Sequence, residues 1–379
     1  IYGSVAPTLA INGGNLSVTN WRITTAAANA GAKPAVSGGT FTSEVPAEYC
    51  AAGFIPTANA DGTYGVKAGA YVAQIGETTY ETLAEAFDAA KDGDTITLLT
   101  DCSGNGIQVP ENRFNSKGLT VDFAGHTYTV GGVLVGSATT GTNAFQLLKD
   151  NKITFKNGTI AGVAENTKPA EDTPNWHGAP AIVIQNYCDL TLTGMTVSGG
   201  DETVYTMSNN CGNVVIENTT INAGKAKGYT SPAVAFDVCR YSSYPSVTVT
   251  VKGNSVINGD VEVSGTIGEG QSRQLYVEGG KFTGEFKVSG NVPANIAISG
   301  GTFSSAVKEE YCATGYIPKD NGDGTYGVKE GVYVAKVDNV KYETLQEAIN
   351  AARDGSTVRL LANVTLTETA VFPAGKTVH

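Results

Sequence analysis

A long tandem repeat constrains this chain more than any other feature of its sequence. Residues 36–101 align without a gap with residues 298–363, at an offset of 262 positions, and 39 of the 66 aligned residues are identical. Each copy contains, in the same order, the segments SGGTF, EYC, DGTYGVK and YETL. Self-similarity at a fixed offset is typical of repeat architectures. Because both ends of the chain also lie inside the pattern, we expect it to be a segment of a longer tandem array.

A second, shorter pattern lies inside the long repeat. Six segments of eight residues have apolar first and third residues, Asn or Gly at the fifth position, and Val, Ile or Phe at the eighth. They span residues 153–160, 190–197, 214–221, 249–256, 275–282 and 296–303. Alternating apolar residues predict a strand with one buried face. Asn or Gly at a fixed place supplies the left-handed backbone of a sharp bend, so each segment predicts a strand, a bend and a second strand.

The starts of these segments are 21 to 37 residues apart, and the shorter spacings are typical of one coil of a parallel β-helix. We therefore predict an all-β solenoid in which each coil buries its apolar side chains against its neighbours. A β-sandwich is the alternative, but its strands would not hold Asn or Gly at one phase. Asn186 and Asn210 each precede a coil start by four residues, and we expect them to form an inward amide ladder.

An amphipathic helix is predicted at the start of each solenoid. Thr82 and Glu85 form a capping box, and Thr344 and Glu347 repeat it. A small β-hairpin with an Asp-Gly turn is predicted in each connector between solenoids. The expected organisation is the end of a preceding β-helix at 1–43, a connector at 44–76, a complete capped β-helix at 77–303, a second connector at 304–338, and the start of the next β-helix at 339–379.

Composition excludes some classes of partner. The formal net charge of −11 gives no electrostatic basis for binding nucleic acid or an anionic membrane. No run of eighteen apolar residues occurs, so we expect no membrane insertion in this segment. The six cysteines include no Cys-x-x-Cys motif. We interpret them as buried thiols, with a bridge between Cys188 and Cys211 as the alternative.

The repeated segments YETLxEAxxAAxDGxTxxLL, SGGTFxSxVxxEYC and DGTYGVK resemble the repeats of adhesin-like surface proteins of Gram-positive bacteria. Such proteins are assigned to the pectin-lyase-like right-handed β-helix superfamily. The resemblance covers nearly the whole chain. It implies right-handed coils, an extracellular location that is secreted or attached to the cell wall, and a structural or adhesin-type role as a stalk or fibre. It carries over no catalytic residue.

The sequence favours a non-catalytic role, with a polysaccharide lyase or glycoside hydrolase as the alternative. Acidic side chains do not share one phase of the coil pattern, and Asp237 with Arg240 is interpreted as a surface charge pair. No cofactor is expected. No metal site is expected either, because the three histidines are isolated and the Asp-Gly turns lack the acidic residue of a calcium loop.

Aromatic side chains in the insertions between coils are the candidate ligand contacts. Aromatic residues on loops of a rigid scaffold commonly hold sugars or protein partners. The expected partner is a glycan or a host surface protein, and head-to-tail self-association between copies stays open. The alternative is that these rings fold down over the flank of the solenoid. The candidate residues are the aromatic Trp176, Tyr205, Tyr229, Tyr241 and Tyr244, together with Arg240.

Overall fold

The computed structural model describes residues 9–22, 34–136, 142–162, 179–290 and 295–374. Most of its regular structure is β, with two α-helices in the described residues. Contacts divide the chain into two compact units, residues 1–89 with 96–100 and residues 90–95 with 101–379. The prediction of an all-β fold with parallel strands is confirmed. The five predicted segment boundaries stay predictions.

The first unit contains a four-stranded sheet in the order β1-β2-β4-β3. Strands β1 and β2 are parallel, whereas β3 and β4 form an antiparallel hairpin closed by the predicted Asp-Gly turn. In this turn the Asp61 carboxylate accepts a hydrogen bond from the Thr63 N–H at 3.0 Å. The bounds are Leu9–Leu16 (β1), Pro34–Phe41 (β2), Phe54–Ala58 (β3) and Tyr64–Ala68 (β4), with a 3-10 helix at Ala47–Tyr49.

Both predicted amphipathic helices are present. Helix α2 covers Leu83–Ala89 and helix α3 covers Leu345–Ala351. In α2 the Glu85 N–H donates to the Thr82 hydroxyl oxygen at 3.1 Å and the Thr82 N–H donates to the Glu85 carboxylate at 3.2 Å, which confirms the capping box. The short strands of the two helix modules are Ala73–Ile75 (β5), Thr78–Tyr80 (β6) and Thr95–Leu98 (β7), then Ala335–Val337 (β30), Val340–Tyr342 (β31) and Val358–Leu360 (β32).

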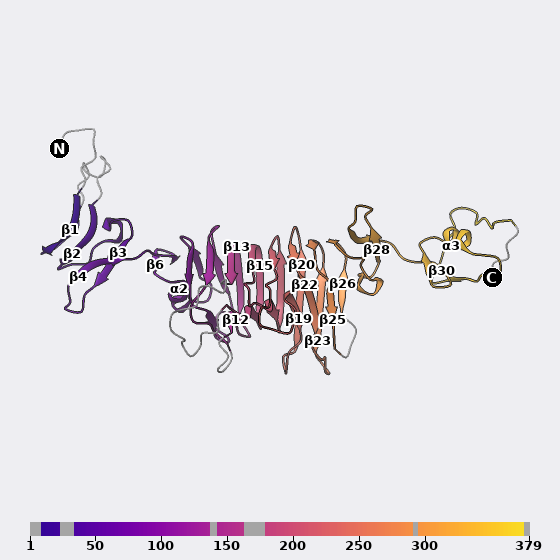
Figure 1. Cartoon of the computed structure of the whole chain (residues 1–379), viewed down its shortest axis with the longest axis horizontal. Helices are drawn as coiled ribbons and strands as arrows, with labels where there is room; N and C mark the ends of the chain where they lie inside the picture. The colour runs from indigo at the N-terminus through magenta and orange to yellow at the C-terminus, as the bar shows by residue number, and fades with distance from the viewer. Residues whose placement is uncertain (1–8, 23–33, 137–141, 163–178, 291–294, 375–379) are drawn as a thin grey trace, which may run out of the picture. The chain divides into compact units, whose positions relative to one another are not determined.

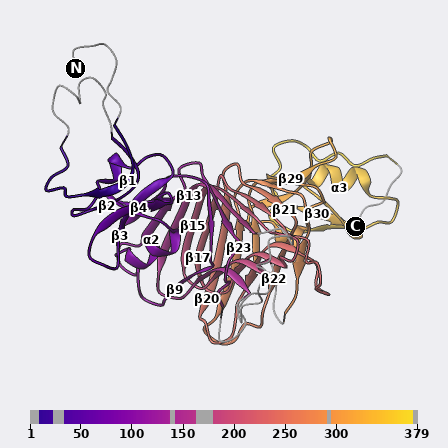
Figure 2. The same ribbon diagram turned by 60° about the vertical axis from the view of Figure 1, so that its left-hand side comes forward.

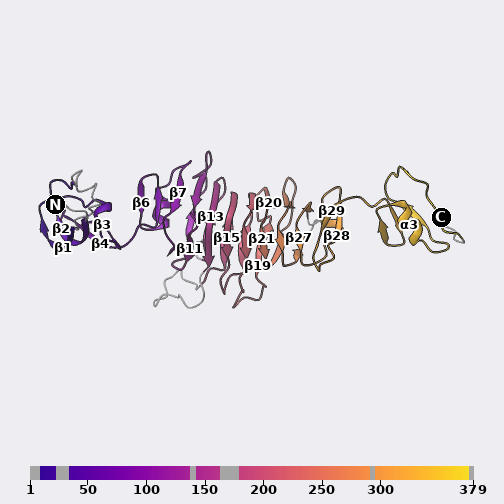
Figure 3. The same ribbon diagram turned by 90° about the horizontal axis from the view of Figure 1, so that it is seen from above.

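The second unit contains a long sheet of parallel strands, which follow one another in chain order in Figures 1 and 3. Their bounds are Cys102–Gly104 (β8), Leu119–Asp122 (β10), Thr127–Val130 (β11), Lys152–Gly162 (β13), Asp189–Ser198 (β15), Gly212–Glu217 (β17), Thr220–Asn222 (β18), Ser246–Lys252 (β20), Val256–Asn258 (β21), Ser272–Val277 (β23), Lys281–Phe282 (β24), Ile296–Ile298 (β26) and Thr302–Phe303 (β27). The connector that follows has a 3-10 helix at Glu309–Tyr311 and an antiparallel hairpin of Tyr316–Asp320 (β28) and Tyr326–Glu330 (β29).

The register of the long sheet follows the six sequence segments. The first residues of all six are partners across neighbouring strands, in the order Ile153, Leu190, Val214, Val249, Leu275 and Ile296. Their third residues form a second column: Phe155, Leu192, Ile216, Val251, Val277 and Ile298. Every side chain in both columns is buried. Each aliphatic side chain that stacks in this way contributes roughly 1.5–3 kcal/mol of hydrophobic free energy.

The bend after each first strand is left-handed, as predicted. The fifth residue has positive φ in the first four segments, at Asn157, Gly194, Asn218 and Gly253, with φ between 48° and 64°. In the last two segments the positive φ moves one residue later, to Gly280 and Gly301.

One prediction within this pattern is wrong. Ile257, and not the predicted Val256, aligns with Ile221 and is buried. The fourth segment has one extra residue in its bend, where the Asn254 N–H donates to the Asn218 side chain at 2.9 Å.

A second parallel sheet of the same unit has the order β25-β22-β19-β16-β14-β12-β9. Figure 2 shows some of these strands together with the long sheet. From Asn143 onward the chain alternates between the two sheets, since each strand of one is followed by strands of the other. The bounds are Ile107–Val109 (β9), Asn143–Leu147 (β12), Ile182–Asn186 (β14), Tyr205–Asn209 (β16), Val234–Cys239 (β19), Asp260–Ser264 (β22) and Phe286–Val288 (β25).

The predicted ladder between Asn186 and Asn210 is wrong. Asn186 is the register partner of Asn209, one residue earlier. The Asn186 amide donates instead to the carbonyl oxygens of Cys188 and Cys211, at 2.9 and 3.4 Å. Asn210 donates to the Ser208 carbonyl at 3.2 Å. The two buried amides therefore bond to backbone carbonyl groups and not to each other.

Candidate functional site

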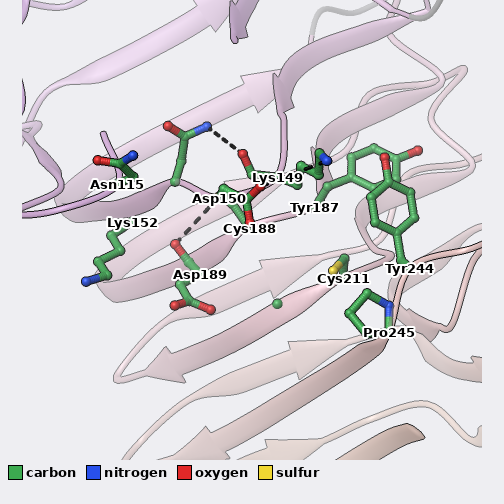
Figure 4. Close-up of a pocket in the computed structure, with 12 residues that line it drawn as sticks. Asn115, Lys149, Asp150, Lys152, Tyr187, Cys188, Asp189, Cys211, Tyr244 and Pro245 are labelled. Carbon is green, nitrogen blue, oxygen red and sulfur yellow. Dashed lines mark hydrogen bonds and ion pairs between the residues drawn. The ribbon is translucent and has the colours of Figure 1, made fainter. Parts of the chain in front are cut away.

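A pocket of about 330 Å³ lies on the second unit, over the turns that lead into the long sheet (Figure 4). Each lining residue lies one to five positions before one of five aligned long-sheet residues, which are Leu119, Ile153, Leu190, Val214 and Val249. Consecutive coils therefore contribute the same kind of turn to one hollow. The lining residues are Asn115, Lys149, Asp150, Asn151, Lys152, Tyr187, Cys188, Asp189, Cys211, Gly212, Tyr244 and Pro245.

Buried asparagines hold these turns in place. The Asn151 amide donates to the carbonyl oxygens of Pro110 and Leu148, both at 2.8 Å, and its carbonyl accepts from the Phe114 N–H at 2.7 Å. Asn186 does the same for the next turn, where its amide links two successive coils. A network with satisfied donors and acceptors is rigid. The floor of the pocket is therefore pre-formed.

A pair of tyrosine rings forms one end of the pocket. The rings of Tyr187 and Tyr244 have centroids 4.9 Å apart and an interplanar angle of 38°. The Tyr244 N–H donates to the Tyr241 carbonyl at 3.2 Å, and the Tyr244 carbonyl accepts from Gln271 at 3.3 Å. Burial raises the pKa of both tyrosines above the usual range. Both rings are therefore neutral phenols at physiological pH.

Polar side chains form the other end, where Asn115, Lys152 and Asp189 lie in Figure 4. The Lys152 ammonium donates to the Ser116 carbonyl at 3.2 Å. The Asp189 carboxylate accepts from the Asn213 N–H and side-chain amide, at 2.9 and 3.1 Å. Lys149 pairs with Glu111 at 3.5 Å. The pocket thus combines an aromatic end with donors and acceptors of balanced charge.

The two cysteines of the pocket are unbonded thiols, as are the other four. Burial raises the pKa of Cys188 far above its usual range and raises that of Cys211. The Cys188 thiol donates to the side-chain amide oxygen of Asn186 at 3.2 Å. Because the thiolate is the nucleophile, burial lowers the nucleophilic fraction of both thiols.

The predicted site residues do not form one surface. Tyr244 lines the pocket. The backbone carbonyl of Tyr241 accepts a hydrogen bond from the Tyr244 N–H, but the Tyr241 ring is exposed. Tyr205 lies on β16, and its hydroxyl contacts Glu262 at 3.5 Å. Tyr229 is exposed in the segment before β19. Trp176 lies outside the described residues.

Arg240 does not form the predicted charge pair. Its guanidinium donates to the carbonyl oxygens of Ser242 and Thr266 and so closes a backbone turn. Asp237 bonds instead to Asn209 and Ser208. The pair does not form because the Asp237 carboxylate points to Ser208 and Asn209 on the neighbouring strand β16.

Tyr187 is a pocket residue that sequence reasoning missed. The predicted contacts lie in the insertions between coils, whereas Tyr187 directly follows β14 in a short turn. The signal was available in the register. Four aligned residues of the long sheet are each preceded, three or four positions earlier, by a pocket residue. Asn115 precedes Leu119, Lys149 precedes Ile153 and Pro245 precedes Val249, each by four positions, and Tyr187 precedes Leu190 by three.

Two carboxyl groups also share a register position that sequence reasoning missed. Asp237 on β19 is the partner of Glu262 on the neighbouring strand β22. Asp237 is only 4% exposed, and it accepts from the Asn209 N–H at 2.6 Å and bonds to the Ser208 hydroxyl at 3.1 Å. Burial raises its pKa to about 8, so Asp237 is mostly protonated at pH 7.

Within the described ranges, no three His, Cys, Asp or Glu side chains gather in a way that could hold a metal ion. No helix of that part of the chain is long and apolar enough to span a bilayer. In comparisons with known proteins, no family model, no curated protein and no solved structure matches this chain.

Proposed function

We propose that this chain is a non-catalytic repeat segment of a bacterial surface protein and that it binds a glycan in the Tyr187–Tyr244 pocket. The proposed scaffold is a right-handed parallel β-helix. The alternation of strands between two parallel sheets and the shared register of the six segments support it. The tandem repeat and the resemblance to adhesin-like surface proteins support a structural role outside the cell.

The contact between the Tyr187 and Tyr244 rings is the observation that carries the proposal. Two neutral rings with centroids 4.9 Å apart form one wall of a hollow whose other end is polar. Sugars have apolar C–H faces and hydroxyl edges, so they suit a site with an aromatic wall and a few polar groups. Lysine and aspartate occur here in equal number, which favours a neutral sugar over a strongly charged one.

Rigidity supports the same conclusion. Asn151 and Asn186 fix the turns under the rings, so a ligand need not order the floor of the pocket when it binds. Pre-organisation of this kind lowers the entropic cost of association. A host protein that inserts a side chain between the turns is the other occupant to be tested.

Affinity electrophoresis of the full chain tests the pocket. Gels contain galactomannan, xyloglucan or mucin, and retardation reports binding. We expect Tyr244→Ala to weaken binding by at least about tenfold, since it removes one ring of the pair. Tyr276→Ala removes an exposed ring from β23 and serves as the matched control. Equal retardation of all three chains, or of none, would refute a glycan site at Tyr244.

Glycoside hydrolysis is the second candidate, and the Asp237–Glu262 pair favours it. Neighbouring parallel strands lie about 4.8 Å apart. A retaining hydrolase uses two carboxyl groups about 5–5.5 Å apart, which residues at one register position of neighbouring strands can provide. Against it, Asp237 is buried and both its oxygens already bond to Asn209 and Ser208. Release of reducing ends that disappears in Glu262→Gln would favour this candidate.

A further inference from the structure

A second pocket, of about 240 Å³, lies where the parallel strands of the second unit end. Its apolar walls are Phe286, Phe303, Val307 and Tyr311. Glu285 and Lys308 stand at the polar side, and the Lys308 ammonium lies 3.3 Å from the Tyr311 hydroxyl and 5.2 Å from its ring centroid. This pocket shares no residue with the tyrosine pocket described above.

The tandem repeat provides an occupied version of the same wall. Phe41, Val45 and Tyr49 are the counterparts of Phe303, Val307 and Tyr311 at the offset of 262. In the first copy the indole ring of Trp21 packs on this wall. Its centroid lies 5.2 Å from the ring of Phe41 and 6.0 Å from the ring of Tyr49. Val45 belongs to the same cluster.

In the second copy, Phe286 takes the place of the indole. Its centroid lies 6.0 Å from the ring of Phe303 and 5.9 Å from the ring of Tyr311, which is close to the geometry of Trp21. The two copies diverge in sequence before residues 36 and 298, so nothing in the repeat dictates the same residue there. A phenyl ring is smaller than an indole and the pocket beside it stays open.

We propose that this second pocket is a binding site for a planar aromatic group, presented by a tryptophan side chain of a partner polypeptide. The walls supply edge and face contacts from three rings, which aromatic groups prefer over aliphatic ones. The Glu285 carboxylate, which already accepts from the Lys287 ammonium at 2.6 Å, lines the pocket and has a further acceptor position for an indole N–H. In the first copy an indole, that of Trp21, packs on the equivalent wall of Phe41 and Tyr49, whereas in the second copy the open volume lies beside Phe286. This proposal goes beyond glycan binding and depends on different residues.

The test uses the full chain and N-acetyl-tryptophanamide as the probe, with ligand-observed NMR to measure binding. N-acetyl-leucinamide is the non-aromatic control ligand. We expect the wild-type chain to bind the tryptophan probe and to bind the leucine control at least about tenfold more weakly. Phe286→Trp fills the pocket from within, and we expect it to weaken probe binding by at least about tenfold.

A reciprocal variant keeps the test decisive if Phe286→Trp folds poorly. Trp21→Phe gives the first copy the smaller ring of the second copy, so we expect two probe sites per chain instead of one. Tyr244→Ala alters the other pocket and is expected to leave probe binding unchanged. Loss of binding in Tyr244→Ala, equal binding of the two amides, or one unchanged site in Trp21→Phe would overturn the proposal.

Discussion

The two copies of the helix module have the same local structure but different burial. Helices α2 and α3 start after equivalent threonines and are equally long. Leu98 is 1% exposed, whereas its counterpart Leu360 is 53% exposed. Leu83 is 1% exposed, whereas its counterpart Leu345 is only partly buried. The local sequence is therefore sufficient for the helix and its strands, and burial depends on packing that the local sequence does not specify.

Short-range contacts repeat closely in the two copies. The N–H of Glu85 donates to Thr82 at 3.1 Å, and that of Glu347 donates to Thr344 at 3.2 Å. The hairpin turns repeat as well, because Asp61 and Asp323 each accept from the N–H two residues later at 3.0 Å. Hydrogen bonds between residues two or three positions apart are determined by the local sequence, so they are the same in both copies although the surroundings differ.

The largest difference between the copies is expected from one leucine pair. Leu98→Ala removes a buried side chain and leaves a cavity, so we expect it to cost about 3 kcal/mol. Leu360→Ala changes an exposed position and is expected to cost less than about 0.5 kcal/mol. Hydrogen exchange of the peptides that contain α2 and α3 measures both effects in the full chain. Equal effects in the two copies would show that the difference in burial does not exist in solution.

A pH dependence is expected from the seven-stranded sheet, whose strands all lie in the segment between the two repeat copies. The pKa of Asp237 is about 8 in the folded chain and near 3.9 when unfolded. The folded state thus holds a proton that the unfolded state releases, and stability falls as the pH rises from about 4 to about 8.

Asp237→Asn isolates this contribution, since an amide keeps the contacts to Asn209 and Ser208 without a charge. We expect the variant to match the wild type near pH 4 and to exceed it by a few kcal/mol at pH 8.5. Chemical unfolding at a series of pH values measures the difference. A constant difference across the range would contradict a buried, protonated Asp237.

The smallest effect is expected at the capping boxes, and here the two copies should agree. Thr82→Ala and Thr344→Ala each remove one side-chain acceptor from the first turn, which costs about 1 kcal/mol. Hydrogen exchange at the amides of residues 85 and 347 reports the local change, with Thr→Ser variants as controls that keep the hydroxyl. A much larger cost in one copy would mean that the cap also depends on its surroundings.

Much of the fold could be predicted because its signals are periodic. Apolar residues at alternate positions gave the columns of the long sheet, and the fixed Asn or Gly gave the left-handed bends. The extra residue before Ile257 was missed because a bulge in a bend leaves the apolar pattern of the strand intact. The predicted ladder of Asn186 and Asn210 was wrong because the spacing between register partners differs in the two sheets. In the long sheet Leu190 pairs with Val214, whereas in the seven-stranded sheet Asn186 pairs with Asn209, so two residues that precede their long-sheet strands by the same number of positions are not partners in the other sheet.

Less of the candidate site could be predicted, because it depends on which turns stack. Tyr187 and Tyr244 are 57 residues apart, and their ring contact follows only from the register of the coils. The pairing of Asp237 with Glu262 depends in the same way on the seven-stranded sheet, which has no fixed sequence signature. Of the predicted loop contacts, Tyr229 is exposed and Arg240 donates to the backbone carbonyl groups of Ser242 and Thr266.

The most direct test of a non-catalytic glycan-binding segment measures binding and cleavage together. The full chain is incubated with galactomannan, xyloglucan and mucin, and retention is recorded alongside new reducing ends and unsaturated ends over a day. The account predicts retention of at least one polysaccharide, weakened in Tyr244→Ala, with no new ends above the protein-free control. Release of ends that disappears in Glu262→Gln would contradict it and assign the chain to the hydrolases, and retention of none of the three would contradict the glycan site itself.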